Sequence, residues 1–291
     1  MAELTPRGAT VMASSLRHSP VALLVFFGML SAARVAWGPV LGAWSQLSAW
    51  QYAGTGLGLF ALGGVLTLAV RSGALARSGS RAVARLPRAS LPPEVRRLAR
   101  RAGVRRVTGL DGADCTAFCA GLLRPTVYVT SGAVRALNPH ELEAVLVHEA
   151  AHARRRDPLR RLLLRAACDV WPYLPVLRWW ARQRMERAEL IADRAALART
   201  NAKAVAGALW TAAGWGPLPS GTGSWSGPGT LQYGAEAGAA DGAVRARLAQ
   251  LSGDPRPDPR PAVFTVAASV AGLLGMIVLT IFLGPGVFAR A

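Results

Sequence analysis

The sequence predicts an α+β protein, namely a multi-pass α-helical membrane protein that also carries a domain with a small β-sheet. Its composition is too apolar for an ordinary soluble chain, since 52% of the residues are hydrophobic and 17% are charged, against about 25% charged residues in soluble domains. Three apolar runs, at 20–37, 53–70 and 263–283, are close to the roughly 20 residues that a helix needs to cross a bilayer. Between the last two runs, patterns typical of strands and helix starts predict the α+β domain.

The distribution of arginine predicts how these spans are oriented. The net charge of +18 comes from 34 basic and 16 acidic residues, and Lys203 is the only lysine. The loop at 38–52 contains no basic residue, whereas arginines precede the first run and follow the second from Arg71 onward. Because basic residues favour the cytoplasmic side, the chain after Arg71 is expected in the cytoplasm. This rule accounts for most of the excess charge and therefore disfavours a nucleic-acid-binding protein.

Four segments are expected along the chain. They are two membrane helices with a short external loop at 1–71, a cytoplasmic-face domain at 72–213, a flexible loop with a short helix and a Pro-rich tether at 214–262, and a C-terminal membrane helix at 263–291. Within the second segment, residues 159–182 are apolar, rich in tryptophan and interrupted by Pro172 and Pro175. Such a stretch is typical of an interfacial or re-entrant helix, which is favoured over a fourth span.

Local patterns predict the strands of the domain. β-branched runs indicate strands at 104–108 and at 126–130. Residues 117–123 are expected to form the other arm of a hairpin with the second of these strands. An arginine-rich helix is expected before them, at 92–102, and a polar helix after them, at 183–199.

A helix start stands at Asn138-Pro139-His140-Glu141. Asparagine suits the N-cap, proline suits the first turn, and Glu141 stands where a capping-box partner belongs. The helix is expected to run from there to about Arg155. Asp157-Pro158 repeats the pattern and predicts the start of another helix.

The motif His148-Glu149-Ala150-Ala151-His152 (HExxH) lies in this predicted helix. Two histidines four residues apart project from one face of a helix, so both imidazoles can bind one Zn²⁺. The glutamate beside the first histidine can then accept a proton from the attacking water. We therefore predict His148 and His152 as zinc ligands and Glu149 as the catalytic base. The alternative is a pair of solvated histidines with Glu149 in a surface salt bridge.

A catalytic zinc site needs a third protein ligand and one open position. No histidine follows His152, so the third ligand has to be a carboxylate. Glu189 and Asp193 share one face of a predicted helix: Glu189 could bind zinc, while Asp193 could accept a hydrogen bond from the second nitrogen of a ligand histidine. Glu186 is the competing ligand, and a charged helix face paired with nearby arginines is the alternative to any metal role.

The three cysteines, Cys115, Cys119 and Cys168, include no CxxC pair. They rule out a disulfide framework and are expected to be small buried apolar residues. The first two lie near the expected edge strand, where an extended peptide could pair with the backbone as an added strand.

At this point the chain resembles a known family, the BlaR/MecR-type membrane metallopeptidases, which are zinc-dependent antirepressors of bacteria. The resemblance covers about 109–199 and is carried by GLLRP at 121–125, LNPHEL at 137–142, HEAAHARRRDP at 148–158 and ERAELIAD at 186–193. It implies a gluzincin-like zinc protease domain at the cytoplasmic face of the bacterial inner membrane, with His148, His152 and Glu189 as ligands and Glu149 as the base. It also implies a cytoplasmic protein substrate such as a winged-helix repressor.

One difference from that family limits the kind of stimulus that the protein can sense. Its β-lactam sensors carry an extracellular serine-acylation domain that needs the motifs SxxK and KTG. The only lysine, Lys203, is preceded three residues earlier by Thr200, so covalent sensing of β-lactams is excluded on chemistry.

The leading functional prediction is a regulatory membrane-bound zinc endopeptidase whose partners are a protein substrate and the lipid bilayer, with no direct contact to nucleic acid. The enzymatic alternative is a housekeeping protease for damaged membrane proteins, similar to HtpX, which shares HExxH and a later ExxxD. The non-enzymatic alternative is a membrane-anchored interaction protein with a vestigial metal site.

Overall fold

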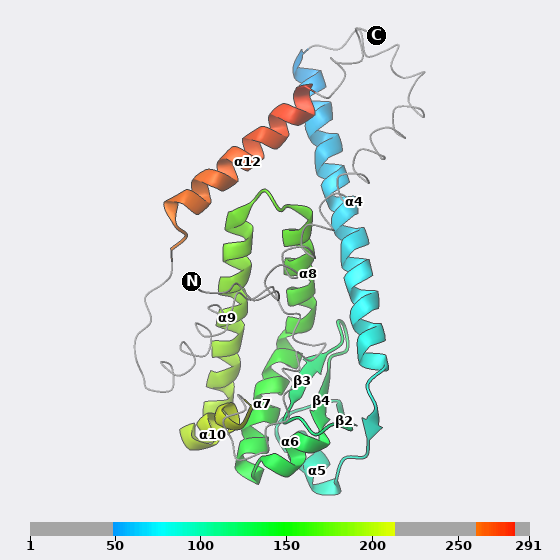
Figure 1. Ribbon diagram of the computed structural model, residues 1–291, viewed down its shortest axis with the longest axis vertical. Coiled ribbons are helices and arrows are strands. Elements are labelled where there is room, and N and C mark those ends of the chain that lie inside the picture. Colours follow the sequence, from blue (N-terminus) through cyan, green and yellow to red (C-terminus); the bar gives the residue numbers. More distant parts are fainter. Residues whose placement is uncertain (1–48, 213–259, 283–291) are drawn as a thin grey trace, which may run out of the picture. The chain divides into compact units, whose positions relative to one another are not determined.

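The helices and strands are defined in a computed structural model that describes residues 49–212 and 260–282 (Figure 1). The predicted first span at 20–37, the loop at 214–242 and the helix at 243–251 lie outside the described residues. In chain order the elements are α4 Ala49–Ala84, β1 Arg88–Ala89, α5 Pro93–Arg101, β2 Val107–Leu110, β3 Ala117–Ala120, β4 Thr126–Thr130, α6 Ser131–Ala136, α7 Pro139–Arg155, α8 Asp157–Val170, α9 Pro175–Leu197, α10 Ala202–Ala212 and α12 Val263–Phe282. The described chain is mostly helical with one small mixed sheet.

The chain divides into two units. Of the described residues, the first unit contains the sheet and comprises 72–165, 178–212 and 260–261, and the second comprises 49–71, 166–177 and 262–282. The predicted zinc-binding motifs all fall in the sheet-bearing unit.

The sheet has the strand order β1-β2-β4-β3, in which β2 and β4 are parallel and the other pairs are antiparallel. The predicted hairpin is confirmed, because β3 pairs with β4 and places Phe118 opposite Tyr128. The strand expected at 104–108 begins later, at Val107. The reason is that the N–H of Val104 still caps α5 by donating to the carbonyl of Ala99, at 2.9 Å.

Helix α7 lies against β3 and β4, and α10 packs on α7 (Figure 1). Alternation along β4 turns Val127 and Val129, both fully buried, into this core, while Tyr128 stacks on Phe118 on the other face. Leu146 and Val147 of α7 are also fully buried. The helix that carries HExxH is thus held between the sheet and α10, which fixes its position.

The predicted start of α7 is confirmed. The Asn138 side chain accepts hydrogen bonds from the N–H groups of His140 and Glu141, and the Glu141 carboxylate accepts one from the N–H of Asn138, all at 3.0 Å. The helix ends at Arg155, and the next residue, Arg156, adopts the left-handed conformation with φ of 54°. Helix α8 then begins at Asp157, as predicted, so one residue separates the two helices.

The prediction of a single helix at 159–182 is wrong, while its interfacial position stays a prediction. Helix α8 ends at Val170 and α9 begins at Pro175, so the stretch belongs to two helices joined by a turn. Pro172 and Pro175 are the physical reason, because proline lacks an N–H and disfavours helical conformation in the residue before it. The predicted polar helix at 183–199 is the continuation of α9.

The second unit combines apolar helices with the turn between α8 and α9. Asp169 pairs with Arg71 of α4 (Nη2 to Oδ2, 2.7 Å), and the N–H of Val176 donates to Ser269 Oγ of α12 at 2.9 Å. A Cβ on Gly272 would lie 2.3 Å from the Tyr173 carbonyl oxygen, so only glycine fits there.

Among the described residues, one helix is long and apolar enough to cross a membrane, Phe60–Ala84 within α4. It overlaps the run predicted at 53–70 and extends beyond it. Helix α12 occupies the third predicted span, although its apolar stretch, Val263–Val278, is shorter. One candidate span is present, and the multi-pass topology stays a prediction.

The packing of α7 generates a stability prediction. Leu146→Ala should lower the free energy of unfolding by about 2–5 kcal/mol, since a fully buried leucine leaves a cavity when truncated. Urea unfolding of the full chain in detergent, followed by tryptophan fluorescence, measures this. The control is Leu123→Ala, whose side chain is 70% exposed and which should change the value by less than about 0.5 kcal/mol.

Candidate metal centre

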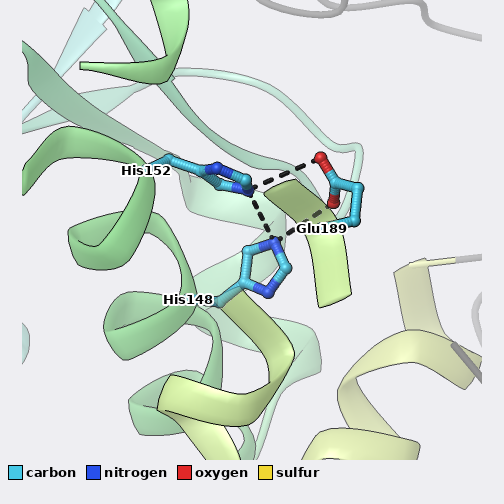
Figure 2. A group of neighbouring side chains, drawn as sticks. All are labelled: His148, His152 and Glu189. Atoms are coloured by element: carbon cyan, nitrogen blue, oxygen red, sulfur yellow. Dashed lines mark hydrogen bonds and ion pairs between the residues drawn. The ribbon is translucent and has the colours of Figure 1, made fainter. Parts of the chain in front are cut away.

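Helices α7 and α9 bring His148, His152 and Glu189 together, with one ligand atom from each lying within 4.8 Å of the others (Figure 2). The two histidines come from one face of α7, and the carboxylate comes from α9. The Nε2 atoms of the two imidazoles are 3.1 Å apart. Glu189 places Oε2 3.4 Å from Nε2 of His148 and Oε1 3.5 Å from Nε2 of His152.

A buried carboxylate holds the other nitrogen of each imidazole. Asp193 Oδ1 lies 2.9 Å from His148 Nδ1, and Asp157 Oδ2 lies 2.8 Å from His152 Nδ1. Asp157 and Asp193 are 2% and 0% exposed, so these contacts are shielded from water. Because a carboxylate accepts hydrogen bonds, each Nδ1 carries a proton, and each Nε2 presents a lone pair to a metal ion once it is deprotonated.

This donor set fits a tetrahedral zinc ion. Nitrogen and oxygen ligands at about 2.0–2.1 Å from zinc lie about 3.3–3.4 Å apart when the angle between them is tetrahedral. The two Nε2 atoms are 3.1 Å apart, and they lie 3.4 and 3.5 Å from Oε2 and Oε1 of Glu189, so each of these pairs is close to this spacing. Two Nε2 atoms only 3.1 Å apart require a proton or a metal cation between them, because two lone pairs at that distance repel, so the arrangement is suited to bind a cation.

The pKa values of the three groups reflect the opposite charges that face one another in the site. Burial lowers the pKa of His152, but its hydrogen bonds to Asp157 and Glu189 outweigh burial and raise it to about 9. Burial also lowers the pKa of His148, but its hydrogen bonds to Asp193 and Glu189 outweigh burial, so this pKa is raised as well. Burial raises the pKa of Glu189, but hydrogen bonds from both histidines and the charge of Arg161 hold it well below its usual range. Protons and a metal ion therefore compete for this site.

A cavity of about 330 Å³ opens at the three donors. Glu149 lines it, as does Arg161 of α8, whose Nη2 donates to Glu189 Oε1. Its remaining walls are mainly apolar side chains of β3, α7 and α10, which are Ala117, Phe118, Cys119, Ala144, Val145, Val205, Ala208 and Leu209. The cavity thus has charged side chains at the three donors and, beside them, an apolar space that can accept apolar side chains of a ligand.

The cysteines in this cavity are poor nucleophiles. Burial, reinforced by the nearby charge of Glu149, raises the pKa of the Cys119 thiol to about 12. Burial and the charge of Glu141 also raise the pKa of Cys115. Because a cysteine nucleophile needs its thiolate form, these two side chains act as small apolar groups, as the sequence predicted.

The structure brings together most of the side chains that the sequence predicted for this centre, and it adds two that were not predicted. The structure groups Glu189 with the histidines, whereas Glu186 is not in the group, and Asp193 contacts a histidine as expected. The contacts of Asp157 with His152 and of Arg161 with Glu189 were not anticipated. Asp157 was interpreted only as a helix start, although an acidic residue just beyond HExxH was the available signal.

Comparison with known protein families agrees with the geometry. Residues 86–213 match the sequence model of peptidase family M48. A peptidase M48 domain is present in this chain. A search of curated proteins found no match.

The M48 domain supports a zinc metalloprotease, and it contains the whole cluster of His148, His152 and Glu189. M48 peptidases use zinc, and these three residues are the ones that could hold it here. The complete donor set inside such a domain favours an enzyme over an interaction protein with a vestigial site.

The two aspartates that hold the histidines generate a prediction about metal binding. Asp157→Asn and Asp193→Asn should each weaken zinc binding roughly 10–100-fold, since the partner of a ligand histidine fixes its tautomer and orientation. Competition with a chromophoric chelator measures the affinity. Asp114→Asn is the matched control, because Asp114 is exposed, and it should bind zinc like the unaltered protein. Equal affinity in all three variants would contradict the assigned role of the aspartates.

Proposed function

We propose that the protein is a membrane-bound zinc endopeptidase with a regulatory role, which cleaves a protein near the cytoplasmic face of the membrane. The single observation that supports this most is the convergence of His148, His152 and Glu189, with Glu149 lining the same cavity, inside a peptidase M48 domain. The candidate span within α4 supports attachment to a membrane.

The mechanism assigns a separate task to each side chain. Zinc supplies Lewis-acid chemistry, since it polarises a carbonyl and lowers the pKa of water. Glu149 accepts the proton of the attacking water and returns it to the leaving amine. His148, His152 and Glu189 would hold the ion, while Asp193 and Asp157 keep the histidines in the required tautomer.

The edge of the sheet supports binding of an extended peptide. β3 is the last strand in the order β1-β2-β4-β3 and has a strand partner on one side only, within the described part of the chain. Its residues line the cavity next to Glu149. An extended substrate could pair with the free side of β3 and place a peptide bond beside the catalytic base, with apolar side chains entering the cavity.

A regulatory role is favoured by the motifs shared with the BlaR/MecR-type metallopeptidases, which imply a single substrate such as a transcriptional repressor. Quality control of membrane proteins is the second candidate. The observation in its favour is the pairing of HExxH with ExxxD in an M48 domain, which HtpX-like proteases share. The two roles differ in how many proteins are cut.

Replacing the catalytic base separates chemistry from metal binding. Glu149→Gln should lower the rate of peptide-bond cleavage about 10²–10⁴-fold, the usual contribution of general base catalysis, while zinc content stays at one ion per chain. Cleavage of a casein substrate and metal analysis of the purified full chain provide both values. Glu143→Gln, on the same helix and outside the cavity, should leave both unchanged; undiminished cleavage by Glu149→Gln would exclude this mechanism.

The number of substrates distinguishes the two roles. Cells that express the unaltered chain should show one or a few new protein N-termini that are missing from cells expressing Glu149→Gln. Mass spectrometry of protein N-termini from both cultures measures this. A repressor cut at one site supports the regulatory proposal, whereas many cleaved membrane proteins would overturn it in favour of quality control.

A further inference from the structure

Each of the three grouped residues also contacts a charged side chain outside the group. Asp193 of α9 contacts His148, and Asp157 at the start of α8 contacts His152, both of α7. Glu189 has Arg161, the one partner of the three that donates its hydrogen bond. The aspartates explain the orientation of the histidines, which leaves the task of Arg161 to be explained.

Arg161 lies one turn after Asp157 on the same face of α8, so this helix contacts two of the grouped residues. Its side chain is 20% exposed, and that of Glu189 is 25% exposed. An exposed ion pair contributes little because water screens it, but this pair is mostly shielded and charge-assisted, which makes it stronger. The Arg161 Nε is buried and has no hydrogen-bond partner among the described residues. The Nη2 atom of the same guanidinium donates to Glu189 and so ties the group to the cavity.

The contact distinguishes the two oxygens of Glu189. Both are close to the imidazoles, with Oε2 3.4 Å from His148 and Oε1 3.5 Å from His152, so a carboxylate free to turn could bind a metal ion through both. Binding through both would fill two positions of the ion, whereas a catalytic site must keep one position open. Arg161 donates to Oε1 and so occupies that oxygen.

We propose that Arg161 is a positioning residue of the metal site: it holds Oε1 of Glu189, leaves Oε2 to bind the ion, and thereby keeps a position of the ion open for reaction. This inference rests on the proposed function. Arginine suits the task because its guanidinium is always charged and offers several donors in a rigid plane. The matched control is Arg160, whose side chain is 60% exposed and lies 3.6 Å from Asp157.

The test replaces zinc with cobalt(II), whose visible absorption is more intense in four-coordinate than in five-coordinate sites and so reports geometry. The metal-free full chain in detergent is titrated with cobalt as the unaltered protein, Arg161→Gln, Arg161→Lys and Arg160→Gln. We expect Arg161→Gln to take up one cobalt per chain with a clear loss of absorption intensity. Arg161→Lys, which keeps a charged donor, should restore most of the intensity, and Arg160→Gln should match the unaltered protein.

Three outcomes would overturn the proposal. They are an unchanged cobalt spectrum in Arg161→Gln, an equal loss in Arg160→Gln, and loss of cobalt uptake in both Arg161 variants, which would make Arg161 essential for the site to form. Thermal unfolding of the metal-free variants checks their folding. If Arg161→Gln does not fold, the cobalt spectrum of Arg161→Lys is compared with that of the unaltered protein instead. Failure of the unaltered protein to bind any metal would instead contradict the proposed function itself.

Discussion

The centre depends on one constraint: the Nε2 nitrogens of two imidazoles face one another at 3.1 Å. Two lone pairs do not tolerate one another at that distance, so a proton or a metal ion has to lie between them, while Asp193 and Asp157 hold the protons of the far nitrogens. This requirement explains the three carboxylates around the imidazoles. Asp157 and Asp193 each orient one imidazole, and Glu189 adds negative charge beside both. The surrounding helices are placed so that these groups arrive together.

The backbone provides this placement in two ways. The pitch of α7 puts His148 and His152 on one face, and the sheet and α10 hold that helix in place. The left-handed residue Arg156 then interrupts the helical conformation at a single position. Helix α8 therefore begins at Asp157, and its first side chain is close enough to contact His152. A longer loop between α7 and α8 would place Asp157 farther from His152 unless the loop folded back toward α7.

Local information predicted a large part of this arrangement. The start of α7, the hairpin of β3 with β4 and the common face of Glu189 and Asp193 all depend on residues close together in the chain, where spacing determines geometry. The ends of elements were less predictable, as at 159–182, where an apolar stretch read as one helix is two helices around a turn. Arg161 could not be recognised because its partner, Glu189, is distant in sequence and any of several arginines could have met it.

Buried charge explains why these residues belong to function and not to folding. Asp193 is fully buried, and Asp157 nearly so, although taking a carboxylate out of water costs several kcal/mol unless partners compensate. Apolar side chains of similar size would fill the same space at lower cost, as alanine and valine do throughout the neighbouring core. The fold instead retains aspartates against imidazoles and a guanidinium against a glutamate. Such a set gains its stability in full only when a cation joins it, which makes metal binding part of the stability of this domain.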